Sequence, residues 1–291
     1  MCGTTIIIPT TCSKAREYCL RRAIDSALAQ AGVEVEIIVV VNGEILDIDL
    51  FGKLKTDARL SVYYLPEGNV SKARYYGIVR GKHDCFAFLD DDDELLPNTL
   101  RHRLEVLNAD GEAAVAVANG YIFDGGDNLH IDNDFYREIL KSPELSFLEK
   151  NWFTTPSALY NKNRLDIKLF DMEFKYFELT YIFFKLIENR HKLVFDNSVA
   201  YRYHEDTATS ASKSEAYSLA YPDMVKLILG MHLSAAAKRI LKRKYLVSLN
   251  SLSNYFLGKG EIGKALYFHI KCLLNGGFNY IFYTRKLLPH H

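Results

Sequence analysis

The stretch FAFLDDDDELLP, residues 86–97, places five consecutive carboxylates directly behind an apolar run. Like charges at neighbouring positions repel by roughly 1 kcal/mol per pair in water, and by several times that near a protein surface. The run from Cys85 to Leu89 is typical of a strand that is buried on both faces. Ending a strand does not require five acids. The cluster therefore predicts a positively charged partner.

Strand and helix patterns alternate in the residues before this stretch. Short, β-branched apolar runs predict buried strands at 4–8, 35–41 and 60–65. Apolar residues recur at helical spacing over 20–28, and a second helix is predicted over 69–81. This alternation predicts a mostly parallel sheet with helices on both faces. Ligands bind beyond the carboxyl ends of the strands in such sheets, so the aspartates follow a strand where a ligand belongs.

The pattern continues less regularly after the acidic stretch. Further elements are predicted in this order: a helix near Pro97, one or two strands at 113–124, a loop at 125–134, a helix at 170–190 and a strand at 192–204. From about Tyr221 onward the pattern is helical, without a convincing strand.

The composition is that of an ordinary globular protein: 48% of the 291 residues are apolar and 25% are charged. Its five cysteines are odd in number and never spaced as C-x-x-C, which argues against a disulfide framework or a zinc site. The sequence shows no signal-peptide pattern and no run of 18 apolar residues. These features predict a cytoplasmic protein.

Charge is distributed unevenly along the chain although the formal net charge is zero. From Pro222 to the end there are 11 Lys and Arg against two acids, so the first 221 residues carry 25 basic against 34 acidic side chains. The tail includes AAAKRILKRKYL, residues 235–246, which is apolar on one side and cationic on the other. Such a helix suits an anionic membrane surface or the acidic body of its own chain or of a partner subunit. No nucleic-acid-binding signature accompanies the basic residues.

Five segments in this order resemble glycosyltransferase family 2, enzymes of the GT-A fold that transfer a sugar from a nucleotide diphosphate donor. They are IIIPTT (6–11), LRRAIDSALAQ (20–30), VVNGE (40–44), GNVSKARYYGI (68–78) and FLDDDD (88–93). The resemblance runs from Thr4 to about Ser210. It implies a Rossmann-like α/β domain with a mostly parallel central sheet flanked by helices over 1–215, followed by a helical C-terminal region over 216–291.

The resemblance also implies which residues hold the donor. The expected donor-binding residues are Pro9, Thr10, Thr11, Asn42, Lys72, Arg74, Asp90, Asp91 and Asp92. On extended backbone Asp90 and Asp92 face the same side, so that one can reach the ribose while the other binds a cation. Asp92 and His204 are the expected ligands of Mn²⁺ or Mg²⁺, which would be the positive partner of the acidic cluster. The alternative is a solvated acidic loop before the helix near Pro97.

Two matches to the family pattern are imperfect. In the turn after the second strand, Val41 and Asn42 stand where the family usually has two Asp, the first of which helps to hold the nucleobase. The family's Glu-Asp pair falls on Glu178 and Leu179, and leucine cannot accept a proton. Glu178 is therefore the predicted general base. On a helix it points about 100° away from its neighbour.

Two further segments are predicted to lie near the substrates. Trp152, Thr154 and Thr155 are predicted on the acceptor side, because aromatic rings stack on sugar rings, although a tryptophan is as often part of a core. Residues 205–215 resemble a lid over bound donor, and the alternative is a plain connector.

Two hypotheses of function follow. The first is a metal-dependent, inverting glycosyltransferase that moves a sugar, most simply from a UDP-linked donor, to a hydroxyl of a glycan or lipid-linked acceptor in cell-surface polysaccharide synthesis. It would act in the cytoplasm or at the inner face of the membrane, as a monomer or a homo-oligomer. The second is a catalytically silent relative that binds nucleotide sugar or glycan and supports a partner enzyme.

Overall fold

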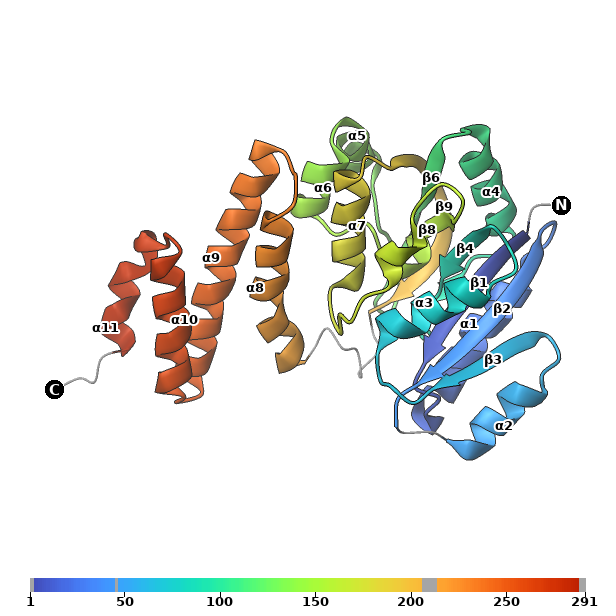
Figure 1. The fold of residues 1–291 in the computed structure, drawn as a ribbon, viewed down its shortest axis with the longest axis horizontal. Coiled ribbons are helices and arrows are strands. Elements are labelled where there is room, and N and C mark those ends of the chain that lie inside the picture. Colours follow the sequence, from blue (N-terminus) through green and yellow to red (C-terminus); the bar gives the residue numbers. More distant parts are fainter. Residues whose placement is uncertain (1–2, 45–46, 206–213, 288–291) are drawn as a thin grey trace. The chain divides into compact units, whose positions relative to one another are not determined.

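The computed structural model describes residues 3–44, 47–205 and 214–287, and it divides the chain into two compact units, 1–208 and 209–291 (Figure 1). The sequence predicted a boundary at 215/216. Most of the predicted lid at 205–215 lies outside the described residues. Each unit is described by itself.

The first unit is built on a sheet whose strands lie in the order β3-β2-β1-β4-β8-β6-β9-β5, with β7 paired to β6. The first half is parallel, as predicted: β3 (Leu60–Leu65), β2 (Glu34–Asn42), β1 (Gly3–Thr10) and β4 (Cys85–Phe88). Beyond β4 the sheet is mixed, because β8 (Ala158–Asn161) is antiparallel to both β4 and β6 (Ala113–Phe123). β9 (Lys192–His204) runs parallel to β6 and antiparallel to the short β5 (Glu94–Leu95).

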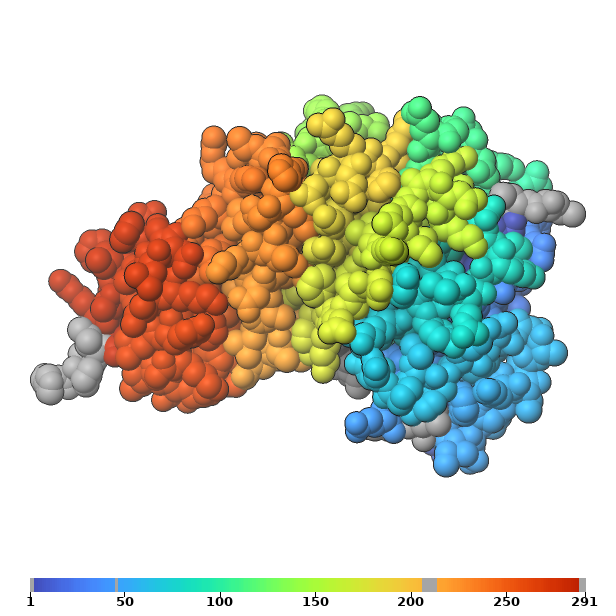
Figure 2. Space-filling model, viewed as in Figure 1, coloured from blue at the N-terminus to red at the C-terminus, as the bar shows by residue number. Residues whose placement is uncertain are grey.

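Alternate residues of β1 pack against different helices, since neighbouring residues of a strand point to opposite faces. Ile6 and Ile8 lie in a core that includes apolar residues of α1 (Glu17–Leu28), α2 (Ile48–Thr56) and α4 (Thr99–Ala109). On the other face Ile7 meets α3 (Val70–Arg80), and a Cβ on Gly77 would lie 2.5 Å from Ile7 Cγ2. Figure 2 shows α3 forming a continuous surface with the segment that follows β8.

Two predicted segments differ from the structure. The predicted loop at 125–134 contains the strand β7 (Asp127–Leu129), which pairs with β6, and the start of α5 (Asn133–Lys141). α6 (Pro143–Glu149) follows directly.

The predicted helix at 170–190 is shorter in the structure, where α7 covers Glu178–Glu188. The residues before it include the end of the 3₁₀ helix η3 (Ile167–Phe170) and an irregular segment. Phe177 has a left-handed φ of 61°, which interrupts helical backbone immediately before Glu178. Ser71 Oγ, on α3, also donates to the carbonyl of Phe174 at 2.8 Å, so that this carbonyl has a partner that does not belong to α7.

The second unit is helical, as the sequence predicted. It contains α8 (Glu215–Leu229), α9 (Ala235–Gly258), α10 (Ile262–Leu274), the 3₁₀ helix η5 (Phe278–Tyr283) and α11 (Thr284–Leu287). α9 packs on both α8 and α10, and its Phe256 ring stacks on Phe268 with 5.6 Å between centroids. Among the described residues, no helix combines the length and the apolar character needed to cross a bilayer.

Candidate functional site

Thr10, Asn42 and the acidic stretch, all predicted to bind the donor, meet at one edge of the sheet because β1, β2 and β4 are parallel. β1 ends at Thr10 and β2 at Asn42, whose Nδ2 donates to the Thr10 carbonyl at 3.2 Å. The pairing of β4 with β1 continues one residue further, since Leu89 N donates to the Ile7 carbonyl at 3.0 Å. The next residue is Asp90. The acidic stretch therefore begins at the carboxyl edge of the parallel strands.

Asp91 points into the protein and is held by two partners. Thr10 Oγ1 donates to Asp91 Oδ2 at 2.6 Å, and Arg16 Nη2 donates to Oδ1 at 2.5 Å. Arg16 is the last residue of the 3₁₀ helix η1 (Lys14–Arg16), between β1 and α1. Burial raises the pKa of Asp91 to about 6, although Arg16 and Thr10 act to lower it. Asp91 thus joins the end of β1 to the acidic stretch.

Asp90 belongs to a second network, which includes the predicted base. Arg74 on α3 donates from Nη2 to Asp90 Oδ1 at 2.6 Å and from Nη1 to Glu178 Oε1 at 2.5 Å. Thr155 Oγ1 donates to the other oxygen of Asp90 at 2.8 Å. Burial alone would lower the pKa of Arg74, but the charges of Asp90 and Glu178 raise it above its ordinary value. One buried guanidinium therefore connects Glu178 to the acidic stretch.

The next two aspartates differ in exposure. Asp92 Oδ2 lies 2.9 Å from Arg16 Nη2, and its backbone carbonyl accepts a hydrogen bond from Arg22. Burial, followed by the charge of Asp90, raises the pKa of Asp92. Asp93, in contrast, is only 1% exposed. Its Oδ1 accepts a hydrogen bond from the backbone N–H of His204 at 2.9 Å, whereas its Oδ2 has no hydrogen-bond partner among the described residues. Burial raises the pKa of Asp93 well above its ordinary value, which favours the protonated form.

Glu94 closes the acidic stretch with partners from β9. Arg202 Nη1 lies 2.8 Å from Glu94 Oε1, and His204 Nε2 lies 3.0 Å from the same oxygen. Burial would raise the pKa of Glu94, but the hydrogen bonds from Arg202 and His204 lower it below its ordinary value. These contacts do not test the predicted metal role of His204, which stays a prediction.

Arginines of the chain itself supply a positive partner for the acidic stretch. Arg16 forms ion pairs with Asp91 and Asp92, Arg74 with Asp90, and Arg202 with Glu94. The sequence predicted a metal ion in this role and, of these arginines, indicated only Arg74 as a partner of the acidic stretch. One available signal was the position of Arg16 directly after the first strand, at the edge where the aspartates also lie. Within the described ranges, no three His, Cys, Asp or Glu side chains form a group that could hold a metal ion.

Three predicted donor residues lie apart from these networks. Pro9 is buried within β1, Thr11 is exposed, and in the described part of the chain neither side chain forms a hydrogen bond with the aspartates. Lys72 forms ion pairs with Glu67 at 2.9 Å and with Glu173 at 3.1 Å, at the surface.

Of the residues predicted on the acceptor side, Trp152 lies in the core, whereas Thr155 belongs to the site. Trp152 is 0% exposed, its Nε1 donates to Ser146 Oγ at 3.1 Å, and its ring packs edge-on against Phe183. The prediction that Trp152 stacks on a sugar is therefore wrong, because both faces of the ring are in the core. Thr155 instead holds Asp90. Thr154 lies just before η2 (Thr155–Ser157) and accepts from Ser157 Oγ through its carbonyl at 2.7 Å.

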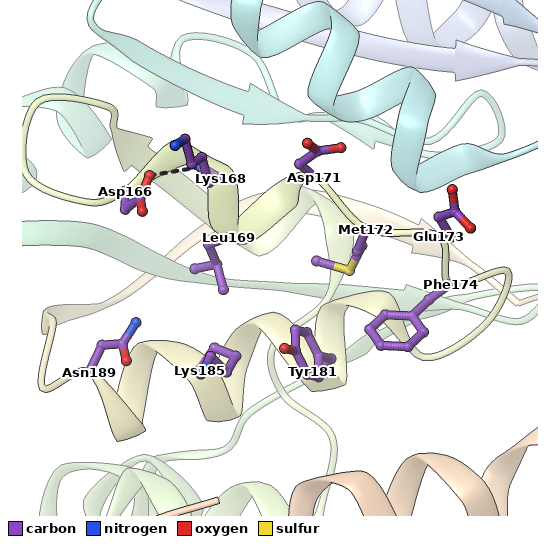
Figure 3. Close-up of a pocket in the computed structure, with 10 residues that line it drawn as sticks. All are labelled: Asp166, Lys168, Leu169, Asp171, Met172, Glu173, Phe174, Tyr181, Lys185 and Asn189. Carbon is purple, nitrogen blue, oxygen red and sulfur yellow. Dashed lines mark hydrogen bonds between the residues drawn. The ribbon is translucent and has the colours of Figure 1, made fainter.

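A groove of about 500 Å³ lies between η3, the segment after it and α7 (Figure 3). Leu169, Met172 and Phe174 turn toward α7, whereas the carboxylates of Asp171 and Glu173 point away from it. The groove extends along α7 from Tyr181, three residues after Glu178. It thus begins one helical turn from the predicted base.

Comparison with known proteins identifies the family. Residues 5–190 match the model of glycosyl transferase family 2. The chain belongs to this family. The matched region includes the acidic stretch, Arg74 and Glu178, and it ends before β9, which supplies Arg202 and His204.

Individual relatives share part of this similarity. An uncharacterised glycosyltransferase of Rickettsia typhi is 31% identical over 153 residues, and one of Rickettsia prowazekii is 30% identical over 153 residues. These alignments cover 53% of this chain and 42% of each relative, so the chain matches less than half the length of these curated relatives. S. aureus TarS residues 1–349, solved in complex with UDP-GlcNAc, superimposes with a TM-score of 0.65 at 17% identity, over 92% of this chain and 80% of that one. The GT-A fold predicted from the sequence is confirmed.

Proposed function

We propose that this chain is a metal-dependent, inverting glycosyltransferase that moves a sugar from a nucleotide diphosphate donor to a hydroxyl of a glycan or lipid-linked acceptor. The observation that carries the proposal is the contact between Arg74 and both Asp90 and Glu178, at 2.6 and 2.5 Å. It links a carboxylate at the strand edge, where donors bind in α/β sheets, to a carboxylate suited to proton transfer. UDP is the proposed nucleotide, supported by the UDP-GlcNAc bound to the similar TarS structure.

The acidic stretch has a donor set that fits Mg²⁺ or Mn²⁺. Asp90 and Asp92 keep side-chain exposures of 30% and 17%, whereas the intervening Asp91 keeps 7%. Mg²⁺ typically takes one or two protein carboxylates and completes its shell with substrate phosphates and water, so a group of three protein ligands is not required. When bound, the cation would neutralise charge on the departing diphosphate. Burial and Asp90 raise the pKa of Asp92, so a cation would also relieve an unfavourable ionisation.

Glu178 is the proposed general base. It is the first residue of α7, and Arg74 contacts its Oε1, while Oε2 forms no hydrogen bond or ion pair within the described residues. Arg74 would fix the carboxylate so that Oε2 accepts the proton of an acceptor hydroxyl on the face opposite the diphosphate. The groove along α7 would carry the rest of the acceptor, because it begins one turn after Glu178 and alternates apolar with charged side chains.

The proposed setting is cell-surface polysaccharide synthesis at the cytoplasmic side of a membrane. This setting is drawn from the family resemblance and from the basic tail.

The test compares wild type with E178Q and D92N for metal-dependent release of UDP from UDP-sugars. Removing a general base typically lowers the rate by about 10²–10⁴-fold, so E178Q should lose most activity and still bind UDP. D92N should weaken UDP binding in the presence of Mn²⁺ and leave binding without Mn²⁺ nearly unchanged. Undiminished release by E178Q would remove Glu178 from the mechanism. UDP binding by wild type without release from any donor would favour the catalytically silent relative.

A further inference from the structure

The second unit has a cationic cavity that the proposed transferase site does not use. It has a volume of about 480 Å³ and lies between α9 and the connection from α10 to η5. The residues that line it include three cations and no acid: Arg239, Lys242, Arg243, Leu246, Gly276, Gly277, Asn279 and Tyr280.

The three cations lie on one face of α9, at spacings of three and four residues. Like charges at these spacings destabilise a helix. Within the described ranges none of the three forms an ion pair, and Lys242 Nζ lies 6.0 Å from the centre of the Tyr245 ring. Among the described residues, three other lysines of this unit form ion pairs: Lys259 contacts Glu215, Lys264 contacts Glu261 at 2.6 Å, and Lys271 contacts Asp223 at 3.4 Å. An anion in the cavity would compensate the charges that the unit itself leaves uncompensated.

Exposed apolar side chains adjoin the cavity. Asn279 and Tyr280, which line it, belong to η5, and the same short helix exposes Phe278, Ile281 and Phe282 by 68%, 51% and 76%. Leu274, the last residue of α10, is 82% exposed. Exposed clusters of large apolar side chains in water mark interaction sites. The occupant of this surface therefore offers an anionic group and an apolar part side by side.

We propose that this surface docks on an anionic lipid bilayer, with a headgroup phosphate in the cavity and with Phe278, Ile281 and Phe282 in the headgroup–acyl boundary. A free phosphate would account for the three cations but would leave the aromatic side chains in water. An anionic bilayer accounts for both, since helices at membrane surfaces combine a cationic face with aromatic and aliphatic anchors. This proposal concerns the second unit alone and does not depend on the transferase reaction.

The experiment is flotation of the full chain with vesicles of phosphatidylcholine alone and of phosphatidylcholine mixed with phosphatidylglycerol. Wild type should float with the mixed vesicles only. Each cation near an anionic surface contributes about a fivefold gain in binding, so R239Q/K242Q/R243Q should bind about a hundredfold more weakly. The matched control K53Q/K55Q/R137Q removes three exposed cations from the first unit and should bind like wild type. F278S/F282S should lose the binding that survives high salt.

Several results would overturn the proposal. These are failure of wild type to bind the mixed vesicles, equal loss in the matched control, or wild-type binding by the cavity variant. Sedimentation velocity tests whether a second copy of the chain occupies this surface instead of a bilayer. If wild type is a dimer and F278S/F282S is a monomer, the exposed apolar side chains form a contact between copies of the chain. Unchanged circular dichroism spectra and melting temperatures would show that the variants, whose altered side chains are exposed, remain folded.

Discussion

Replacing Arg74 by Met should lower the free energy of unfolding of the first unit by about 3–5 kcal/mol, because removing one partner leaves buried carboxylates unpaired. Arg74 is 3% exposed and contacts Asp90, Glu178 and Thr155. Asp90 and Glu178 keep 30% and 15% side-chain exposure, so both can recover some hydration in the variant. This places the expected loss at the lower end of the range.

The only tryptophan gives an assay for this unit by itself. Trp152 is fully buried in the first unit, and the second unit contains no tryptophan. Urea unfolding followed by tryptophan fluorescence therefore reports the unit that contains Arg74. K72M is the matched control, since Lys72 is on the same helix but pairs only at the surface, and it should cost less than about 1 kcal/mol.

A double-mutant cycle isolates the contact between Arg74 and Glu178. R74M and E178Q should be non-additive, with a coupling of about 1–3 kcal/mol, as residues in direct contact usually are. A cost of R74M no larger than that of K72M, or additive effects in the cycle, would refute the inference that this guanidinium holds both carboxylates.

Three further predictions use the same fluorescence assay. Burial raises the pKa of Asp91 to about 6, so the folded state favours the protonated side chain. This stabilising contribution is fully present below the ordinary pKa of aspartate and is lost as the pH rises through about 6. The free energy of unfolding of wild type relative to D91N should accordingly fall by about 2 kcal/mol from pH 4 to pH 7, and a flat difference would contradict the raised pKa. G77A should lower the free energy of unfolding by about 1–3 kcal/mol, because its Cβ would meet Ile7. The control G52A, on α2, places a Cβ where no atom lies within 4 Å and should raise the free energy of unfolding by about 0.5–1 kcal/mol. Equal effects would contradict the close packing of α3 on β1. Arg103 is 1% exposed, its guanidinium has no hydrogen-bond partner among the described residues, and burial lowers its pKa to about 10. R103M should therefore leave the free energy of unfolding unchanged or raise it by about 1–2 kcal/mol. A loss above about 2 kcal/mol would mean that the guanidinium has a stabilising partner.

Local patterns in the sequence were sufficient to predict the first half of the sheet. The runs at 35–41 and 60–65 became β2 and β3, and α3 begins after the Asn69 cap, because apolar periodicity and capping are properties of adjacent residues. The start of α7 was harder to place. Nothing in the apolar pattern before Glu178 indicates that Phe177 adopts a left-handed φ or that Ser71 binds the Phe174 carbonyl.

The partners in the site depend on contacts between distant residues. The sequence predicted that Asp90 and Asp92 face the same side on extended backbone. The exposures do alternate, but the backbone there forms a turn, in which Asp93 N donates to the Asp90 carbonyl at 3.1 Å. That Arg16, 75 residues from Asp91, supplies its positive charge requires knowing that η1 turns back over the carboxyl edge. Trp152 was misplaced for a related reason: a single aromatic residue in a sequence does not reveal that Phe147, Phe183 and Phe195 surround it.

The position of β9 has a consequence for the order in which the protein folds. Arg202 reaches Glu94 across 108 residues of sequence, and the backbone of His204 reaches Asp93 across 111. Contacts this far apart form late, because a long loop must close before they contribute. An intermediate that has assembled β1 to β4 would therefore still expose an incompletely neutralised row of acids. Its completion should be faster in mildly acidic buffer or at high ionic strength, where repulsion within that row is weaker.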